Sequence, residues 1–171
     1  EKEPGTLEQL ISTPITSLEL LLGKLLPYLA VGLVDLALIV GAAVLIFGVP
    51  FRGSYIDLFI ASLIFLIGSL SWGLFVSVVA KSQIQASQIS VISAFLPSFL
   101  LSGFIYPIEN MPVVLQALTF IVPARYFVEI LKGLFLQGVG LTVLWPQVLA
   151  LVIYAALVFN LARKRFTKRI L

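Results

Sequence analysis

Residues 58–80 read LFIASLIFLIGSLSWGLFVSVVA, an unbroken apolar run without a charged side chain. A helix needs about 20 such residues to cross the roughly 30 Å hydrocarbon core of a membrane, and this run extends about 35 Å as a helix. Residues 82–108 and 133–162 also lack charge, and residues 25–47 carry only Asp35. The sequence therefore predicts an all-α integral membrane protein with four transmembrane helices.

The composition supports this class and excludes several others. The chain is 60% hydrophobic and 11% charged, with a mean hydropathy of +1.13, whereas soluble domains carry about 25% charged residues. It contains no histidine and no cysteine, which excludes disulfides, thiol nucleophiles and Cys/His metal sites. An intramembrane enzyme is disfavoured, because one mid-membrane carboxylate cannot form a pair and Ser–Lys chemistry is conceivable only at Lys81 and Ser82, where we expect a turn.

The distribution of lysine and arginine predicts that both ends of the chain are cytoplasmic. Short cytoplasmic loops carry an excess of these residues. Three fall on the predicted outer side: Arg52, Arg125 and Lys132. Eight fall on the side of the two ends: Lys2, Lys24, Lys81, Arg163, Lys164, Arg165, Lys168 and Arg169. Because they gather at membrane edges, the net charge of +3 does not indicate nucleic-acid binding.

The predicted organisation has two parts. Residues 1–22 form a cytoplasmic coupling segment and elbow, and residues 23–171 form the transmembrane domain. The expected spans are residues 23–47, 57–80, 84–105 and 145–162, followed by a basic cytoplasmic tail at 163–171.

The elbow rests on two helix-start signals. Thr6 with Gln9, and Thr16 with Glu19, each fit a capping box, and Pro14 between them disfavours a continuous helix. We expect a short helix on the membrane surface and then a helix that rises through the membrane. The polar opening does not resemble a signal peptide, so we expect a fragment of a longer protein.

We expect residues 106–144 to form an irregular segment on the outer side of the membrane. Residues 113–122 lie between two prolines and are too few to span, which favours a re-entrant or interfacial segment. Residues 124–136 have one apolar face and one charged face, with Arg125 and Glu129 spaced i,i+4. We expect this helix at the outer interface.

Small residues recur every four positions in two spans, which favours close helix packing. Span two has Ser69, Gly73 and Ser77, for which we prefer packing within the chain. Span three has Ala86, Ser90, Ala94, Ser98 and Ser102, and here packing and a translocation path or dimer seam are equally open. Gln85, Gln88 and Pro97 in span three suit a helix beside a water-accessible path.

Asp35 lies near the middle of span one. A carboxylate at membrane depth is costly and marks a functional site by default. A structural hydrogen bond to serines of a neighbouring span is the alternative. We favour a structural or gating role over proton transport, because no other ionisable residue lies at that depth.

Several motifs resemble one family. The opening EKEPGTLEQL with Thr13-Pro14-Ile15 resembles the coupling segment of bacterial type-2 ABC-exporter permeases. The sequence PIENMP at 107–112 resembles the outer-loop motif of that family, and PARYF at 123–127 with ILKG at 130–133 resembles its next helix. The family more often has asparagine before the proline that corresponds to Pro123, where this chain has Val122.

The resemblance implies the C-terminal part of a six-span permease subunit in the bacterial cytoplasmic membrane. It implies a complex with a second permease subunit, as a homodimer or heterodimer, and with ABC ATPase subunits. The sequence has no phosphate-binding Gly-x-x-x-x-Gly-Lys-Ser/Thr loop, so we expect no cofactor on this chain, with ATP and magnesium in the partner.

The resemblance also implies site residues. The ATPase-coupling residues would be Glu3, Thr6, Leu7, Glu8, Gln9 and Leu10. From the patterns in the spans and from the outer-loop motif, we expect the translocation and gating residues to be Asp35, Gln88, Ser98, Ser102, Glu109 and Asn110. The alternative function is a secondary transporter or a structural membrane subunit without an ATPase, and the ATP dependence of transport would separate the two. The substrate is left open.

Overall fold

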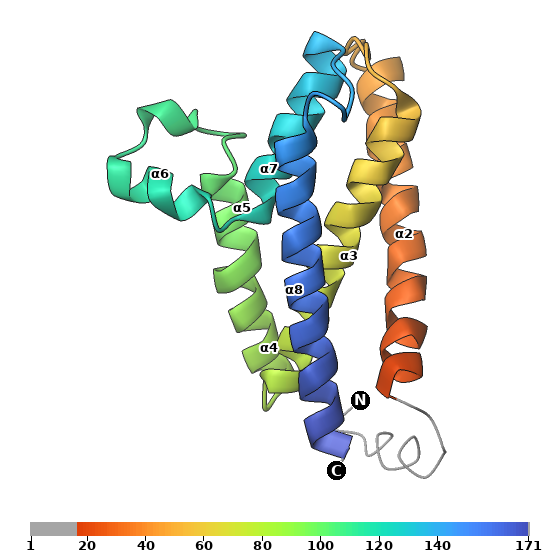
Figure 1. Ribbon diagram of the computed structural model, residues 1–171, viewed down its shortest axis with the longest axis vertical. Helices are drawn as coiled ribbons and strands as arrows, with labels where there is room; N and C mark the ends of the chain where they lie inside the picture. The colour runs from red at the N-terminus through yellow and green to blue at the C-terminus, as the bar shows by residue number, and fades with distance from the viewer. Residues whose placement is uncertain (1–16, 171) are drawn as a thin grey trace.

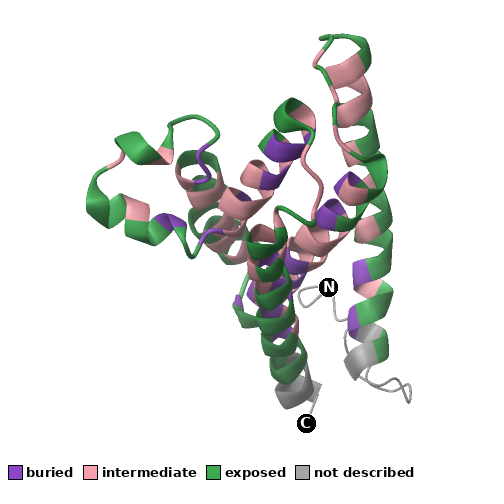
Figure 2. Cartoon of the chain, turned by 45° about the horizontal axis from the view of Figure 1, so that its top comes forward, coloured by how far each residue is buried: buried purple, intermediate pink, exposed green. Residues whose placement is uncertain are grey.

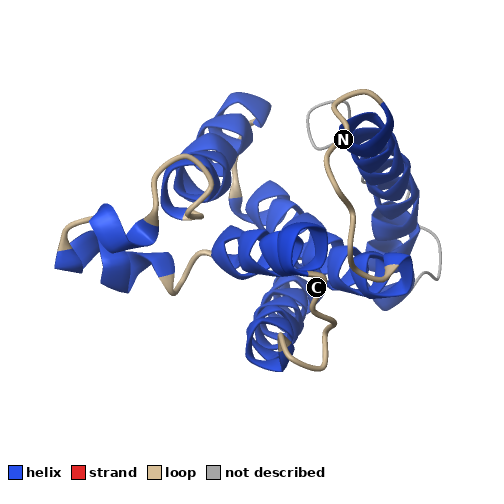
Figure 3. Ribbon diagram, turned by 90° about the horizontal axis from the view of Figure 1, so that it is seen from above, coloured by secondary structure: helices blue, strands red, loops and turns tan. Residues whose placement is uncertain are grey.

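The computed structural model describes the backbone of residues 17–170 and the side chains of Glu19 and residues 21–165. The described residues are helical and contain no strand. Seen from above, loops occur only where helices connect (Figure 3). The predicted coupling helix falls in residues 1–16, outside the described residues, and stays a prediction.

Within the described residues, four helices are long and apolar enough to cross a membrane, as the sequence predicts. They are α2 (Ser17–Leu45), α3 (Tyr55–Val79), the composite span Gln83–Leu101 and α8 (Trp145–Ile170). In Figure 1 these helices run along the long axis, with α2 at one edge and the short helix α6 (Val113–Thr119) at the other. The chain is thus a multi-pass, all-α membrane protein.

The turn between α3 and the third span is closed by side chains. Ser82 Oγ accepts a hydrogen bond from the Gln85 amide at 3.2 Å, and Gln85 Oε1 accepts one from the Lys81 amide at 2.8 Å. This exchange satisfies amides that a helix start leaves without partners. The predicted tight turn at residues 81–83 is confirmed.

The third span has a widened turn before its proline. It consists of α4 (Gln83–Ser90), a π-helical turn (Val91–Phe95) and α5 (Leu96–Leu101). Pro97 lacks an amide hydrogen and its ring crowds the carbonyl four residues earlier, and a π turn accommodates that mismatch. The predicted end of the span at residue 105 is wrong: helix stops at Leu101, because Gly103 takes a left-handed φ of 78°.

The core lies where α3, α7 (Pro123–Lys132) and α8 meet. Its buried residues are Leu58, Ala61, Ile130, Leu134 and Leu151. Burying each large aliphatic side chain removes apolar surface that would otherwise be solvated by water or lipid, and fixes the helices against one another by van der Waals contact.

Close packing in α3 uses different small residues from those predicted. Gly68 is buried, and a Cβ there would lie 2.9 Å from the ring of Tyr154 in α8. In contrast, Gly73 and Ser77 of the predicted stripe are exposed, and nothing lies within 4 Å of a Cβ built at Gly73. The prediction that this stripe packs within the chain is therefore wrong for Gly73.

The buried side chains of α2 lie in its first turns. Leu21 and Leu25 are buried against Ala162 of α8, with side chains of α3 packed around them. Farther along, Gly32 receives the side chain of Leu66, whose Cδ2 would lie 3.0 Å from a Cβ. Most of the remaining α2 surface is exposed (Figure 2).

Candidate functional site

A sharp corner in the chain forms the candidate site, and two prolines bound its helices. Helix α6 begins directly after Pro112, and α7 begins at Pro123. Proline suits a first helical position, because its missing amide hydrogen would have no partner there. The pair Val113–Thr119 and Pro123–Gln137 is bent by 85°, and α6 stands out from the bundle (Figure 1). The predicted helices are present; a re-entrant or interfacial position in a membrane stays a prediction.

Arg125 holds this corner. Its Nη1 donates a hydrogen bond to Oγ1 of Thr119, the last residue of α6, whose side chain is fully buried. Its guanidinium carbon also lies 4.0 Å from the centre of the Phe120 ring, a cation–π distance. The Tyr126 hydroxyl donates to the Phe120 carbonyl at 2.9 Å. The corner is thus fixed by polar contacts that a flexible hinge would lack.

Glu129 extends the network to α8. Its Oε1 lies 3.4 Å from Nε of Arg125, which confirms the predicted i,i+4 pair. Its Oε2 accepts a hydrogen bond from Nε2 of Gln147 at 3.2 Å. Gln147 Oε1 is buried and has no hydrogen-bond partner in the part of the chain that the structure describes. One chain of polar contacts therefore links α6, α7 and the first turn of α8.

Lys132 joins α7 to the third span. Its Nζ donates a hydrogen bond to the Gly103 carbonyl at 2.9 Å. Gly103 lies just past the C-cap of α5, so the ammonium group lies near the end at which the helix carries partial negative charge. Sequence reasoning placed Lys132 only on a charged face. The sequence offered one signal of this contact, because Lys132 is one of three charged residues on one helix face next to spans without charge.

A shallow hollow opens between α5 and α7, with a volume of about 260 Å³. It contains Ser98 and Ser102, two of the predicted translocation residues, although its surface is almost wholly apolar. The full lining is Phe95, Ser98, Phe99, Ser102, Phe104, Ala124 and Val128. Ser102 is buried, and its Oγ accepts a weak hydrogen bond from the Phe104 amide at 3.4 Å.

The other predicted gating residues lie apart from this hollow. Glu109 and Asn110 are exposed in a 3-10 turn (Ile108–Asn110), where Gln116 Nε2 donates to backbone carbonyls of the turn and of Met111. Gln88 is exposed on α4, and Asp35 is exposed on α2. The structure therefore brings only two of these six residues together.

The predicted alternative for Asp35, a hydrogen bond to serines of a neighbouring span, is absent from the described part of the chain. The predicted coupling residues Glu3, Thr6, Leu7, Glu8, Gln9 and Leu10 lie outside that part. Within residues 17–170 no group of three or more His, Cys, Asp or Glu could hold a metal ion. The arrangement at the corner suits mechanical coupling between helices.

Four long apolar helices and a bent helical pair define a multi-pass membrane protein. Residues 1–136 match the ABC-2 type transporter family, and the chain belongs to that family.

The curated relatives carry permease names. The chain is 45% identical to the probable multidrug ABC transporter permease YbhS of Escherichia coli K12, over 99% of this chain and 45% of the relative. It is 32% identical to the probable multidrug ABC transporter permease YbhR of the same organism, over 100% of this chain and 46% of the relative. ABC transporter G family member 20 of Dictyostelium discoideum is 26% identical, over 93% of this chain and 22% of the relative. The chain thus spans less than half of the relatives' length. No solved structure matches it.

Proposed function

We propose that this chain is part of the membrane-spanning permease of an ATP-driven exporter in a bacterial cytoplasmic membrane, powered by a separate ABC ATPase. The observation that carries the proposal is the family match over residues 1–136, which includes the segment that resembles an ATPase-coupling helix. The names of the bacterial relatives support a permease role. A second permease subunit would complete the path, and neither a nucleic acid nor a cofactor on this chain is needed.

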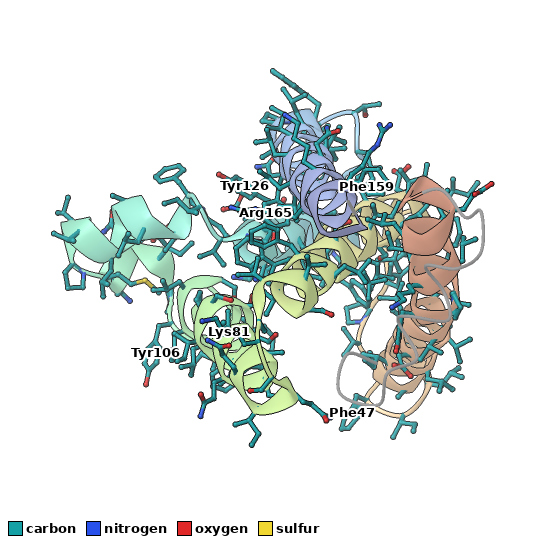
Figure 4. All side chains as sticks on the ribbon, turned by 90° about the horizontal axis from the view of Figure 1, so that it is seen from below. Phe47, Lys81, Tyr106, Tyr126, Phe159 and Arg165 are labelled. Atoms are coloured by element: carbon teal, nitrogen blue, oxygen red, sulfur yellow. The ribbon has the colours of Figure 1, made fainter. Side chains whose placement is uncertain are left out.

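Orientation follows from the charges. The turn before α4, which contains Lys81, and the C-terminal end of α8 lie at the end of the bundle where α2 begins (Figure 1). Figure 4 shows the bundle from that end. The positive-inside rule makes that end cytoplasmic. Both ends of the chain would then face the ATPase, and the corner would face outward.

The contacts offer a route for motion from the ATPase to the outer side. Glu3, Glu8 and Gln9 would contact the ATPase, and its closure would tilt α2 as a rigid body. Movement of α2 would reach α8 through the buried contacts of Leu21 and Leu25 with Ala162. In the first turn of α8, at its opposite end, Gln147 donates a hydrogen bond to Glu129 on α7.

The corner would act as part of the exit gate. Helix α7 binds α6 through Arg125 and the end of α5 through Lys132. A shift of α7 would therefore move both walls of the hollow that contains Ser98 and Ser102. Its apolar lining suits an apolar or amphipathic substrate, a class that includes many drugs.

A charge reversal in the coupling segment tests the proposal. The full-length permease is purified from its native membrane with and without Glu8→Lys, and the co-purified ATPase is quantified by mass spectrometry and by ATP hydrolysis. Glu1→Lys is the matched control, since it reverses a charge in the same segment outside the coupling residues.

We expect an ATPase with the parent and the control, and reduced association or uncoupled hydrolysis with Glu8→Lys. A preparation that transports substrate but contains no ATPase would instead establish a secondary transporter. An unaltered complex with Glu8→Lys would remove the assigned contact.

A further inference from the structure

One face of α2 is uncovered through the middle of the span. Its exposed large side chains are Tyr28, Val31, Leu38 and Ile39, with relative exposures of 58% to 67%. Figure 2 shows this helix at the edge of the molecule with exposed residues along its outer surface. Asp35 lies on that same face and is itself exposed.

Within the described residues, Asp35 has no hydrogen bond and no ion pair. Its position is 14 residues after Leu21 and 10 before Leu45, the limits of the apolar span, which places it near the middle of a membrane. Helices α3 and α8 are the neighbours of α2, and their central residues, 58–80 and 145–162, contain no charged side chain. The described part of this chain therefore supplies no cation at that depth.

Two simple occupants of this face do not satisfy the carboxylate. Lipid acyl chains offer no hydrogen-bond donor. A second copy inserted in the same direction, packed through α2, would bring its own Asp35 to the same depth, and two nearby carboxylates disfavour each other's charge. A basic side chain would stabilise the Asp35 carboxylate, because ionisable residues inside membranes pair with one another.

We propose that the Asp35 face of α2 packs against a further membrane-spanning helix that places a lysine or arginine beside Asp35. More than half of each bacterial relative lies outside the segment that this chain matches. The helix belongs to that remainder of the full-length permease. The proposal goes beyond transport and does not depend on it.

Photo-crosslinking tests the partner directly. A photoreactive amino acid is placed at Val31 or Leu38, one turn on either side of Asp35, in the full-length permease in its native membrane. The two native side chains are 58% and 66% exposed, so substitution leaves the described packing intact. Leu36, which is half-buried on α2, is the control position.

We expect both positions to form a crosslink within one polypeptide, to a span with a lysine or arginine at the matching depth, and we expect Leu36 to give a different product. Adducts only with lipid, a crosslink between two copies of α2, capture of a separate protein, or a captured span without a basic residue would each overturn the proposal.

A charge exchange provides the second test and does not require each single variant to fold. Asp35→Lys should lower the amount of permease in the membrane severalfold. Combining it with aspartate at the captured basic position should restore the amount. Leu38→Lys combined with the same partner change is the control and should not be rescued. An absence of rescue in the first combination, or equal rescue in both, would refute the pairing.

Discussion

Arg125 is the residue on which the shape of the corner between α6 and α7 depends most directly. Replacing it with methionine keeps much of the volume and removes three contacts. These are the hydrogen bond to buried Thr119, the cation–π contact 4.0 Å from the Phe120 ring, and the 3.4 Å pair with Glu129. The side chain of Arg125 is only 16% exposed, so water replaces these contacts incompletely.

The magnitude follows from the separate contacts. A hydrogen bond from a charged group contributes about 1.5–3 kcal/mol, and a partly exposed cation–π contact about 0.5–1 kcal/mol. The pair with Glu129 adds only about 0.5 kcal/mol, because the Glu129 side chain is 35% exposed. Together they amount to about 3 kcal/mol, or roughly a hundredfold increase in the population of an opened corner.

The assay measures the position of α6 relative to α8. The sequence contains no cysteine, so spin labels at Val114 and Ile153, which are 73% and 50% exposed, report one distance by pulsed electron resonance. Arg125→Met should broaden the distance distribution. Arg125→Lys, which keeps the charge but loses the planar fork, should broaden it less. A narrow, unshifted distribution for Arg125→Met would refute the assigned clamp.

Three further predictions concern helix packing and the hollow. Gly68→Leu should destabilise the α3–α8 contact by about 1–3 kcal/mol and lower the melting temperature in detergent, whereas Gly73→Leu, on an open surface, should leave it unchanged; equal effects would contradict the packing. Lys132→Met removes the cation at the end of α5 and should weaken that helix end by about 1–2 kcal/mol. Amide exchange at residues 101–105 should become faster, and unaltered exchange there would exclude the role of Lys132 in holding this helix end. Leucine at Ser98 and Ser102 should fill the hollow and impair transport at normal expression, so unimpaired transport would remove these two residues from the path.

The sequence predicted the elements well where their signals are local. Long charge-free runs identify the spans, because length and polarity alone decide whether a helix can cross a membrane. Two prolines likewise set the starts of α6 and α7. The charged face of α7 was readable from the i,i+4 spacing of Arg125 and Glu129.

Helix faces were harder to predict. In a span that is apolar all round, the hydrophobic pattern does not mark the packed side, and small residues occur on several faces. The stripe through Gly73 and Ser77 was therefore chosen over Gly68, the glycine that contacts α8. The end of the third span was missed because apolar residues continue to Ile105, while the left-handed backbone at Gly103 ends the helix.

Contacts between distant segments were beyond local patterns altogether. Nothing near Lys132 in the sequence indicates that its ammonium group binds the Gly103 carbonyl 29 residues earlier. The positions of the predicted gating residues are another example, because only the fold decides that Ser98 and Ser102 share a hollow while Gln88 is exposed on α4.

Energy coupling is the central claim, and transport by the reconstituted full-length permease tests it most directly. Proteoliposomes are prepared with the permease alone and with its co-purified ATPase, and accumulation of a fluorescent amphipathic drug is followed with ATP and with a non-hydrolysable analogue. The account predicts accumulation only with the ATPase and hydrolysable ATP, in vesicles whose cytoplasmic side faces out. Transport by the permease alone, driven by an ion gradient without ATP, would contradict it.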